Sequence, residues 1–359
     1  MKTAFISNSP LKILNTINMV INNVENTSGT TDVFVEMIFK NAEEICNKLE
    51  ETKLFNKVIR CYKKNIKLDK FTDLLGYKKI LSIYDFSDNS FKANKYDQLF
   101  VGDRSLLGVA LSYMNKPNVF IYDDGIITYS GNCIVNEKTY KYPFLNKLFK
   151  TDVFSFNIKK LYVNNKEFCR STISENIEQL PLLNNDNKAL PIIKDIFKYN
   201  ENSLLINHDL LILEQPIEEK QNYNGVKFID VVNSLDIKTL KPLVRLHPRQ
   251  KDLVYENIDM DTVNNMWELE CINTITDKHI LVSFFSTVQF SPKMIANKQP
   301  YVIFLYKLFL SNLDGLEIPG FEEMIQQLKD KYDDSSKIFV PENIEEFKQI
   351  IERLQNENK

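Results

Sequence analysis

Short apolar runs rich in β-branched residues alternate with longer amphipathic stretches along the whole chain. In the first half, the expected strands cover 3–6, 33–38, 57–61, 99–101 and 118–122. Between them, apolar residues recur every three or four positions over 10–20 and 42–54, which is the spacing of a helix with one buried face. This alternation is typical of βαβ units and predicts an α/β fold with parallel sheets.

A second series of strands is expected in the other half, over 204–206, 210–213, 243–246, 279–283 and 301–304. Polar, asparagine-rich sequence around 183–187 and 199–203 separates the two series. We therefore expect a boundary near residue 190, with one Rossmann-like domain over 1–190 and another over 191–359. The end of the chain predicts a helix over 321–332, a strand over 338–340 and a final helix capped by Asn343.

Composition and charge exclude several classes of protein. Of the 359 residues, 43% are hydrophobic and 26% are charged, which is typical of globular domains and excludes wholesale disorder. The 45 basic and 48 acidic residues give a net charge of −3, so the chain as a whole is not drawn to nucleic acid. The nine glycines never form G-x-G-x-x-G or G-x-x-x-x-G-K-[ST], which excludes the ordinary dinucleotide-binding and P-loop motifs.

The cysteines and the apolar segments indicate the compartment. Five cysteines without a C-x-x-C pair, and three scattered histidines, predict reduced thiols and no structural zinc. The sequence shows neither a secretory apolar region nor a run of about 20 apolar residues. We expect a cytoplasmic protein. Peripheral association with the inner face of the plasma membrane stays open, because the basic and aromatic segment 138–150 could contact lipid, although a lid or ordinary packing explains it equally well.

In a doubly wound domain, ligands bind beyond the carboxyl ends of the strands. The strand expected over 118–122 runs into Asp123, Asp124 and Gly125. An Asp-Gly turn is the alternative reading, and two adjacent carboxylates point to opposite faces, so one of them can face a cleft. A D-x-D pattern at 259–261 follows no apolar strand, and we expect it in a polar surface loop.

The strand expected over 243–246 ends at His247, and a proline separates this histidine from Arg249. A histidine at a strand end beside a guanidinium suits a proton donor for an anionic leaving group. A structural histidine is the alternative. The motif therefore predicts either acid catalysis at this strand end or a packed imidazole.

Two further strand ends carry polar groups. After the strand over 279–283, Ser286 and Thr287 are expected at the start of a helix, where free N–H groups bind phosphate. A plain helix cap explains the same residues. The strand over 210–213 leads through a proline to acidic residues that include Glu218, and such glutamates also serve simply as partners of a helix dipole.

Together these segments resemble glycosyltransferase family 52, the bacterial lipooligosaccharide and capsular α-2,3-sialyltransferases. The resemblance is carried by D-D-G at 123–125, H-P-R at 247–249 and F-F-S-T at 284–287, with further similarity over 6–12 and 266–269. It implies a GT-B fold, in which two Rossmann-like domains face a central cleft. It also implies CMP-sialic acid as the donor substrate, with no metal and no other cofactor.

The resemblance also assigns roles to residues. It makes His247 the general acid for the departing CMP phosphate. It implies that Ser286 and Thr287 bind that phosphate and that Glu268 accepts hydrogen bonds from the ribose hydroxyls. For the general base it leaves two candidates: Glu218, beside the position where the closest members carry an aspartate, and Asp124. Further substrate-binding residues are expected at Arg249, Asp123, Gly125, Ser9, Gln215 and Pro216.

The function expected from this resemblance is inverting transfer of sialic acid from CMP-sialic acid to a terminal galactose of a lipooligosaccharide or capsule. A GT-B enzyme with another nucleotide sugar, such as a glucosyltransferase, is the alternative. A non-catalytic partner in glycan assembly is a third hypothesis. A homodimer stays open, and the acceptor glycan and linkage are not given by the residues.

Overall fold

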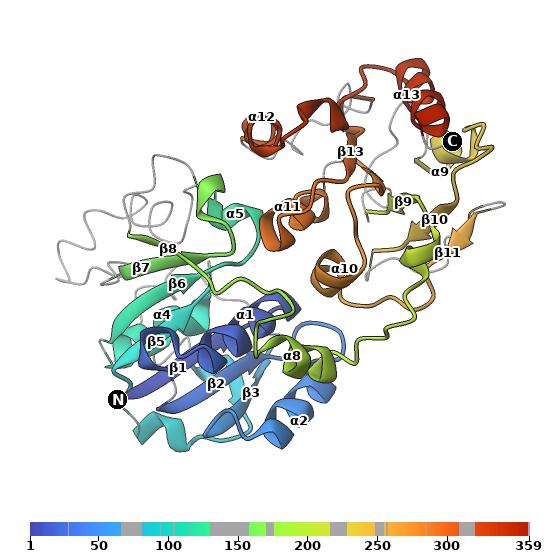
Figure 1. The fold of residues 1–359 in the computed structure, drawn as a ribbon. Coiled ribbons are helices and arrows are strands. Elements are labelled where there is room, and N and C mark those ends of the chain that lie inside the picture. Colours follow the sequence, from blue (N-terminus) through green and yellow to red (C-terminus); the bar gives the residue numbers. More distant parts are fainter. Residues whose placement is uncertain are drawn as a thin grey trace. The chain divides into compact units, whose positions relative to one another are not determined.

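The computed structural model describes residues 1–27, 29–65, 81–93, 95–102, 105–115, 117–129, 158–169, 176–215, 228–247, 255, 258–284, 286–308 and 320–357. The chain divides into two compact units, Met1–Phe197 and Lys198–Lys359. Each unit is an open sheet with helices packed on it (Figure 1). The predicted boundary near residue 190 falls at the start of helix α8 (Leu190–Ile196), which contacts α1 (Pro10–Ile21) and α2 (Ala42–Thr52) of the first unit.

The described strands of the first unit form one eight-stranded sheet in the order β4-β3-β2-β1-β5-β6-β7-β8. All neighbours run parallel except β3 and β4, which are antiparallel. The strands are β1 (Lys2–Ser7), β2 (Thr30–Glu36), β3 (Lys57–Lys63), β4 (Tyr84–Phe86), β5 (Gln98–Val101), β6 (Asn118–Tyr122), β7 (Ile158–Val163) and β8 (Ile177–Gln179). The remaining helices are α4 (Leu106–Asn115), α5 (Ile126–Tyr129) and the 3-10 helices η1 (Val24–Asn26), η3 (Ser90–Ala93) and η4 (Lys166–Phe168).

A row of aromatic rings stabilises the centre of this sheet. Phe5, Phe100 and Phe120 are in register on β1, β5 and β6, and their rings stack with centroids 4.3 and 4.7 Å apart. Two residues further along β6, the buried Tyr122 hydroxyl donates to the Ile6 carbonyl oxygen at 2.6 Å. The carboxyl ends of β1 and β6 are therefore held together across β5.

The described strands of the second unit form a six-stranded parallel sheet in the order β11-β10-β9-β12-β13-β14. They are β9 (Leu210–Leu213), β10 (Pro242–Arg245), β11 (Asp259–Met260), β12 (Ile280–Ser283), β13 (Tyr301–Phe304) and β14 (Ile338–Phe339). The helices are α9 (Phe228–Asn233), α10 (Trp267–Asn273), α11 (Ser291–Ala296), α12 (Phe321–Lys331), α13 (Ile344–Glu357), and the 3-10 helices η5 (Leu204–Asn207), η6 (Thr287–Gln289) and η8 (Ser335–Lys337).

Both faces of the second sheet are covered, which explains the unbroken apolar runs of its strands. Along β9, Leu210 and Ile212 pack into the core that contains Phe347 of α13. Leu211 and Leu213 pack into the opposite core, which contains Trp267 of α10. None of the described helices is long and apolar enough to cross a membrane.

Two expectations about the second unit are wrong, one of them in part. The segment 204–206 is part of the 3-10 helix η5 rather than a strand, because the Ser203 hydroxyl caps it by accepting the Leu205 N–H at 3.3 Å. The D-x-D segment is a surface loop only in part, since the Asp259 side chain is 79% exposed. Its first two residues are strand β11, and the Asp261 carboxylate is fully buried against Arg245, with Nη1 and Oδ2 3.1 Å apart.

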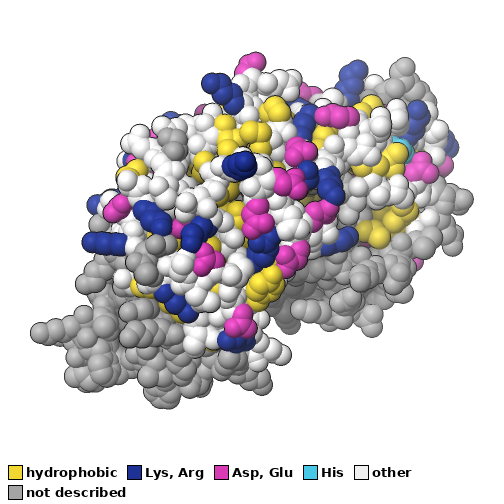
Figure 2. All heavy atoms as spheres, turned by 90° about the horizontal axis from the view of Figure 1, so that it is seen from below, with side chains coloured by type: hydrophobic (Ala, Val, Ile, Leu, Met, Phe, Trp, Pro, Cys, Tyr) yellow, Lys and Arg dark blue, Asp and Glu magenta, His cyan; other side chains and the backbone are white. Residues whose placement is uncertain are grey.

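Charged side chains of both signs are interspersed on the face of the molecule seen from below in Figure 2. Hydrophobic side chains lie among them on the same face. Among the described residues drawn on this face the two signs are mixed, in keeping with the net charge of −3.

Candidate functional site

The strand order of the second unit reverses between β9 and β12, and ligands bind beyond the carboxyl ends of strands at such a point. Ser283, the last residue of β12, donates its hydroxyl to the Leu213 carbonyl oxygen at 2.7 Å and to Gln215 Oε1 at 3.3 Å. Glu214 is 4% exposed and accepts hydrogen bonds from the Tyr255 hydroxyl and, at 2.9 Å, from the Gln215 N–H. The polar ends of β9 and β12 therefore meet at one edge.

His247 follows the carboxyl end of the neighbouring strand β10 and is half-buried. The end of β10 is tied to that of β9, since the Glu214 N–H donates to the Arg245 carbonyl oxygen at 2.9 Å. His247 and Gln215 thus follow adjacent strands at the same edge. Their sequence neighbours Pro216, Glu218, Pro248 and Arg249, which the sequence places in the same motifs, lie outside the described residues.

The other two histidines lie at the opposite edge of this sheet, before β9 and β12. His208 Nε2 is 3.1 Å from Asp259 Oδ2. His279 is buried, and its Nδ1 accepts the Thr276 N–H at 2.9 Å. A cavity of about 360 Å³ lies between them. Of the three histidines, His247 is the one at the carboxyl edge.

Ser286 is the N-cap and Thr287 the first residue of the 3-10 helix η6, so both hydroxyl residues lie at the start of a helix, as the sequence predicts. The Ser286 N–H donates to Gln289 Oε1 at 3.4 Å, and the buried Gln289 side chain donates to the Ile303 carbonyl oxygen at 2.8 Å. Ser286 is therefore linked to β13 through Gln289. Glu268 is half-buried in the first turn of α10.

The first sheet also reverses its order, between β1 and β5, and a buried lysine occupies that point. Lys12 has no exposed surface, and its Nζ lies 2.6 Å from Asp124 Oδ2 and 2.7 Å from Asn8 Oδ1. Ser9 caps α1 by accepting the Lys12 N–H at 3.3 Å. A Cβ added to Gly102, which follows β5, would lie 2.0 Å from Lys12 Cε, so glycine leaves the room that this side chain needs. Sequence reasoning noted Ser9 and missed Lys12.

The two adjacent carboxylates after β6 have different surroundings. Asp123 is 1% exposed and accepts hydrogen bonds from the Tyr129 hydroxyl, the Asn164 N–H and side-chain amide, and the Gly125 N–H. Burial raises the pKa of Asp123, against the effect of these donors. Gly125 turns the chain at φ +90°, a conformation that favours glycine. Asp123 thus ties the ends of β6 and β7 together, and the Asp124 carboxylate, 24% exposed, is the one that solvent can reach.

Glu36 is a further buried carboxyl at this edge that the sequence reasoning missed. It ends β2 and is 5% exposed, with Oε2 accepting the Tyr84 hydroxyl at 3.1 Å and Oε1 accepting the Ser105 hydroxyl at 3.3 Å. Burial raises the pKa of Glu36. The available signal was a carboxylate directly after the apolar run 33–35.

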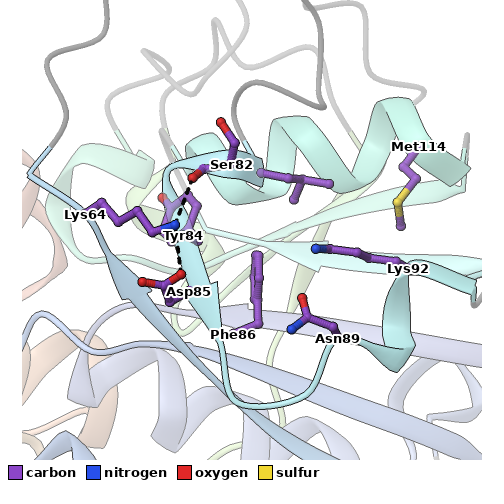
Figure 3. Close-up of a pocket in the computed structure, with 9 residues that line it drawn as sticks. Lys64, Ser82, Tyr84, Asp85, Phe86, Asn89, Lys92 and Met114 are labelled. Carbon is purple, nitrogen blue, oxygen red and sulfur yellow. Dashed lines mark hydrogen bonds and ion pairs between the residues drawn. The ribbon is translucent and has the colours of Figure 1, made fainter.

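A cavity of about 590 Å³ lies beside β3 and β4 in the first unit (Figure 3). Lys64 Nζ pairs with Asp85 Oδ1 at 2.8 Å on its wall, and Lys92 Nζ lies 5.7 Å from the Phe86 ring centroid. None of the residues that sequence reasoning selected lines it. The strand-end residues are the stronger candidate site, because they lie where the strand order of each sheet reverses.

The comparisons with known proteins identify the fold and no family. No family model matches the chain, and no curated protein matches it. Among solved structures, the GT-B domain of a sialyltransferase from Photobacterium damselae superposes with a TM-score of 0.53 at 12% identity, covering 95% of this chain and 100% of that one. A glycotransferase of kitacinnamycin gives a TM-score of 0.52 at 8% identity, with 99% and 90% covered. S. aureus MnaA, solved with UDP, gives 0.50 at 11% identity, with 98% and 87% covered.

These likenesses show that the chain has the GT-B fold, which confirms the α/β class and the architecture that the sequence motifs implied. At such low identity they show the fold alone. The roles assigned to individual residues stay predictions.

Proposed function

We propose that this protein is an inverting, metal-independent sialyltransferase that moves sialic acid from CMP-sialic acid to a terminal galactose of a bacterial surface glycan. The observation that carries this proposal is that His247, Gln215 and Ser283 lie at the carboxyl ends of adjacent strands β10, β9 and β12, where the strand order of the second sheet reverses. A sialyltransferase with the same fold supports it.

The chemistry follows from the groups at this edge. The acceptor hydroxyl oxygen attacks the anomeric carbon of the sugar while the bond to the CMP phosphate oxygen breaks. His247 gives its proton to that phosphate, and the hydroxyls of Ser286 and Thr287 bind it, so charge is neutralised without a metal ion. Glu268 accepts hydrogen bonds from the ribose hydroxyls. Asp124 or Glu218 takes the proton from the attacking hydroxyl of the acceptor.

A second candidate is a GT-B enzyme with a uridine-nucleotide sugar as its donor. It is favoured by the likeness to MnaA, whose structure contains UDP. The same strand ends could bind either nucleotide, so the two candidates differ in base recognition rather than in phosphate chemistry.

Release of CMP from CMP-sialic acid in the presence of a galactoside tests the proposal directly. We expect turnover that persists in EDTA, whereas turnover of a UDP-sugar alone would favour the second candidate.

His247→Ala should lower kcat roughly 10²- to 10⁴-fold with little change in donor KM, and His208→Ala, at the opposite edge, should not. Of Asp124→Asn and Glu218→Gln, one should abolish transfer and the other should not. If the protein binds no nucleotide in a calorimetric titration, a non-catalytic role is the correct one.

A further inference from the structure

Trp267, the single tryptophan of the chain, connects three segments of the second unit. It is the first residue of α10 and is 7% exposed. Its indole N–H donates to the Val288 carbonyl oxygen in η6 at 2.9 Å. The guanidinium of Arg245, the last residue of β10, lies 5.5 Å from the centroid of its ring. One indole therefore contacts both the end of β10 and the 3-10 helix η6.

Arg245 also shapes the loop that leads into α10. Its Nη1 is 3.1 Å from Asp261 Oδ2, and its Nη2 donates to the Asn265 carbonyl oxygen. The other oxygen of Asp261 accepts the N–H groups of Val263 and Asn264 at 3.1 and 3.0 Å. The side chains are 13% and 0% exposed, so this ion pair is shielded from water and removing one partner is costly. The first turn of α10 is thus fixed to the end of β10.

We propose that Arg245 and Trp267 are positioning residues that hold three groups, His247, Glu268 and Ser286, in the arrangement that binds a nucleoside monophosphate. The proposal rests on the proposed function. His247 lies two residues after Arg245, Glu268 directly follows Trp267, and Ser286 lies two residues before the carbonyl that the indole binds. Because each group belongs to a different element, only contacts between the elements can set their separations.

Trp267→Phe tests the link to η6, since it keeps an aromatic ring and removes the indole N–H. Tyr199→Phe is a matched control, because the Tyr199 hydroxyl also contacts α10, 2.9 Å from Thr274 Oγ1 and 3.3 Å from Glu270 Oε2. Each substitution removes one polar group from a buried or partly buried aromatic side chain: Trp267 belongs to α10, and Tyr199 contacts α10 from the segment after α8. Arg245→Lys is a second variant, which keeps the charge for Asp261 and loses the planar group over the indole.

Two measurements on the full-length proteins separate positioning from bulk stability. Hydrogen exchange without nucleotide should become faster over 286–291 in Trp267→Phe and stay unchanged there in Tyr199→Phe. Calorimetric titration should show CMP affinity roughly 3- to 10-fold weaker in Trp267→Phe and Arg245→Lys, the effect of one lost hydrogen bond, and within twofold of wild type in Tyr199→Phe. The indole emission of the wild type should shift as CMP saturates the protein.

Faster exchange across the whole second unit would make Trp267 an ordinary core residue and overturn the inference. So would unchanged CMP affinity in both Trp267→Phe and Arg245→Lys. If the wild-type protein binds no CMP, the proposed function fails instead, and the inferred link between Trp267 and η6 is then decided by the exchange comparison alone.

Discussion

Lys12 has no exposed surface, so its ammonium depends on protein groups in place of water. Asn8 and Asp124 supply them at 2.7 and 2.6 Å. Gly102 makes room for the side chain, because an added Cβ would lie 2.0 Å from Lys12 Cε. The position of Asp124, a candidate base, therefore depends on Lys12 and, through it, on an unsubstituted Gly102.

Lys12→Met and Gly102→Ala should each lower the free energy of unfolding by roughly 1–3 kcal/mol, because each breaks the same charged contact. Their costs should not add in the double variant, since the contact can be lost only once. Urea unfolding of the wild type, both single variants and the double variant measures this coupling. Additive costs would mean that Gly102 acts through something other than Lys12.

The pKa of Glu36 gives a pH prediction. Burial raises this pKa above its ordinary value of 4.5, so the folded protein keeps the proton at pH values where the unfolded chain has released it. Its contribution to stability is therefore full at low pH and is lost as the pH rises through the folded value. Glu36→Gln stays neutral and retains an oxygen for the Tyr84 hydroxyl, so its Tm should match the wild type near pH 4 and exceed it by a few degrees at about pH 8. A Tm difference that does not vary with pH would contradict this.

The sequence predicted those residues of the candidate site that follow apolar runs, such as His247 and Gln215. They could be predicted because parallel strands have their carboxyl ends at the same edge of the sheet. Sequence reasoning missed Lys12 and Arg245. A lysine in a first helical turn and an arginine at a strand end are ordinarily solvated, and here their burial is set by Gly102 and Asp261, which are distant in the sequence. Such pairings depend on tertiary packing that no local pattern records.

At the scale of single elements, the sequence predicted that Asn343 caps the last helix, and the structure contains this cap. Asn343 Oδ1 accepts the Glu346 N–H at 2.9 Å at the start of α13. Asn343→Ala should lower the free energy of unfolding by about 1 kcal/mol, and Asn343→Asp, which keeps the acceptor, should lower it much less. Equal losses in thermal unfolding would show that the cap contributes nothing beyond packing.

Strands that are buried on both faces were predicted more accurately than strands at or beside a sheet edge. Runs buried on both faces, at 118–122, 210–213 and 301–304, have the predicted bounds in the structure. The strands β4, β7 and β8 were not predicted, because they lie at or beside a sheet edge and carry polar residues within short sequences. The run at 204–206 is equally apolar, yet Ile206 is 60% exposed, so hydrophobicity alone does not distinguish a 3-10 turn from a strand.

At the scale of the whole molecule, the two series of apolar runs correspond to two sheets, and this much of the GT-B fold could be predicted from the sequence. The strand order could not. In the second unit β12 pairs with β9, although β10 and β11 separate them in the sequence, and the order in each sheet depends on such long-range pairing. The placement of Gln215, His247 and Ser283 after adjacent strands of the second sheet, and of D-D-G at an edge of the first, therefore needed the structure.

The division of the chain into two units predicts which unit a bound nucleotide stabilises. His247, Glu268 and Ser286 all belong to the unit Lys198–Lys359, so CMP alone should stabilise that unit, by roughly 2.7 kcal/mol at a concentration 100 times its Kd. Hydrogen exchange with and without CMP should show slower exchange over 244–247, 266–270 and 286–291, and little change over 2–36. Lys12→Met, whose contact lies in the other unit, should leave CMP affinity within twofold of wild type. Protection concentrated over 7–12 and 122–129 would place the nucleotide on the first unit and contradict the role assigned to His247.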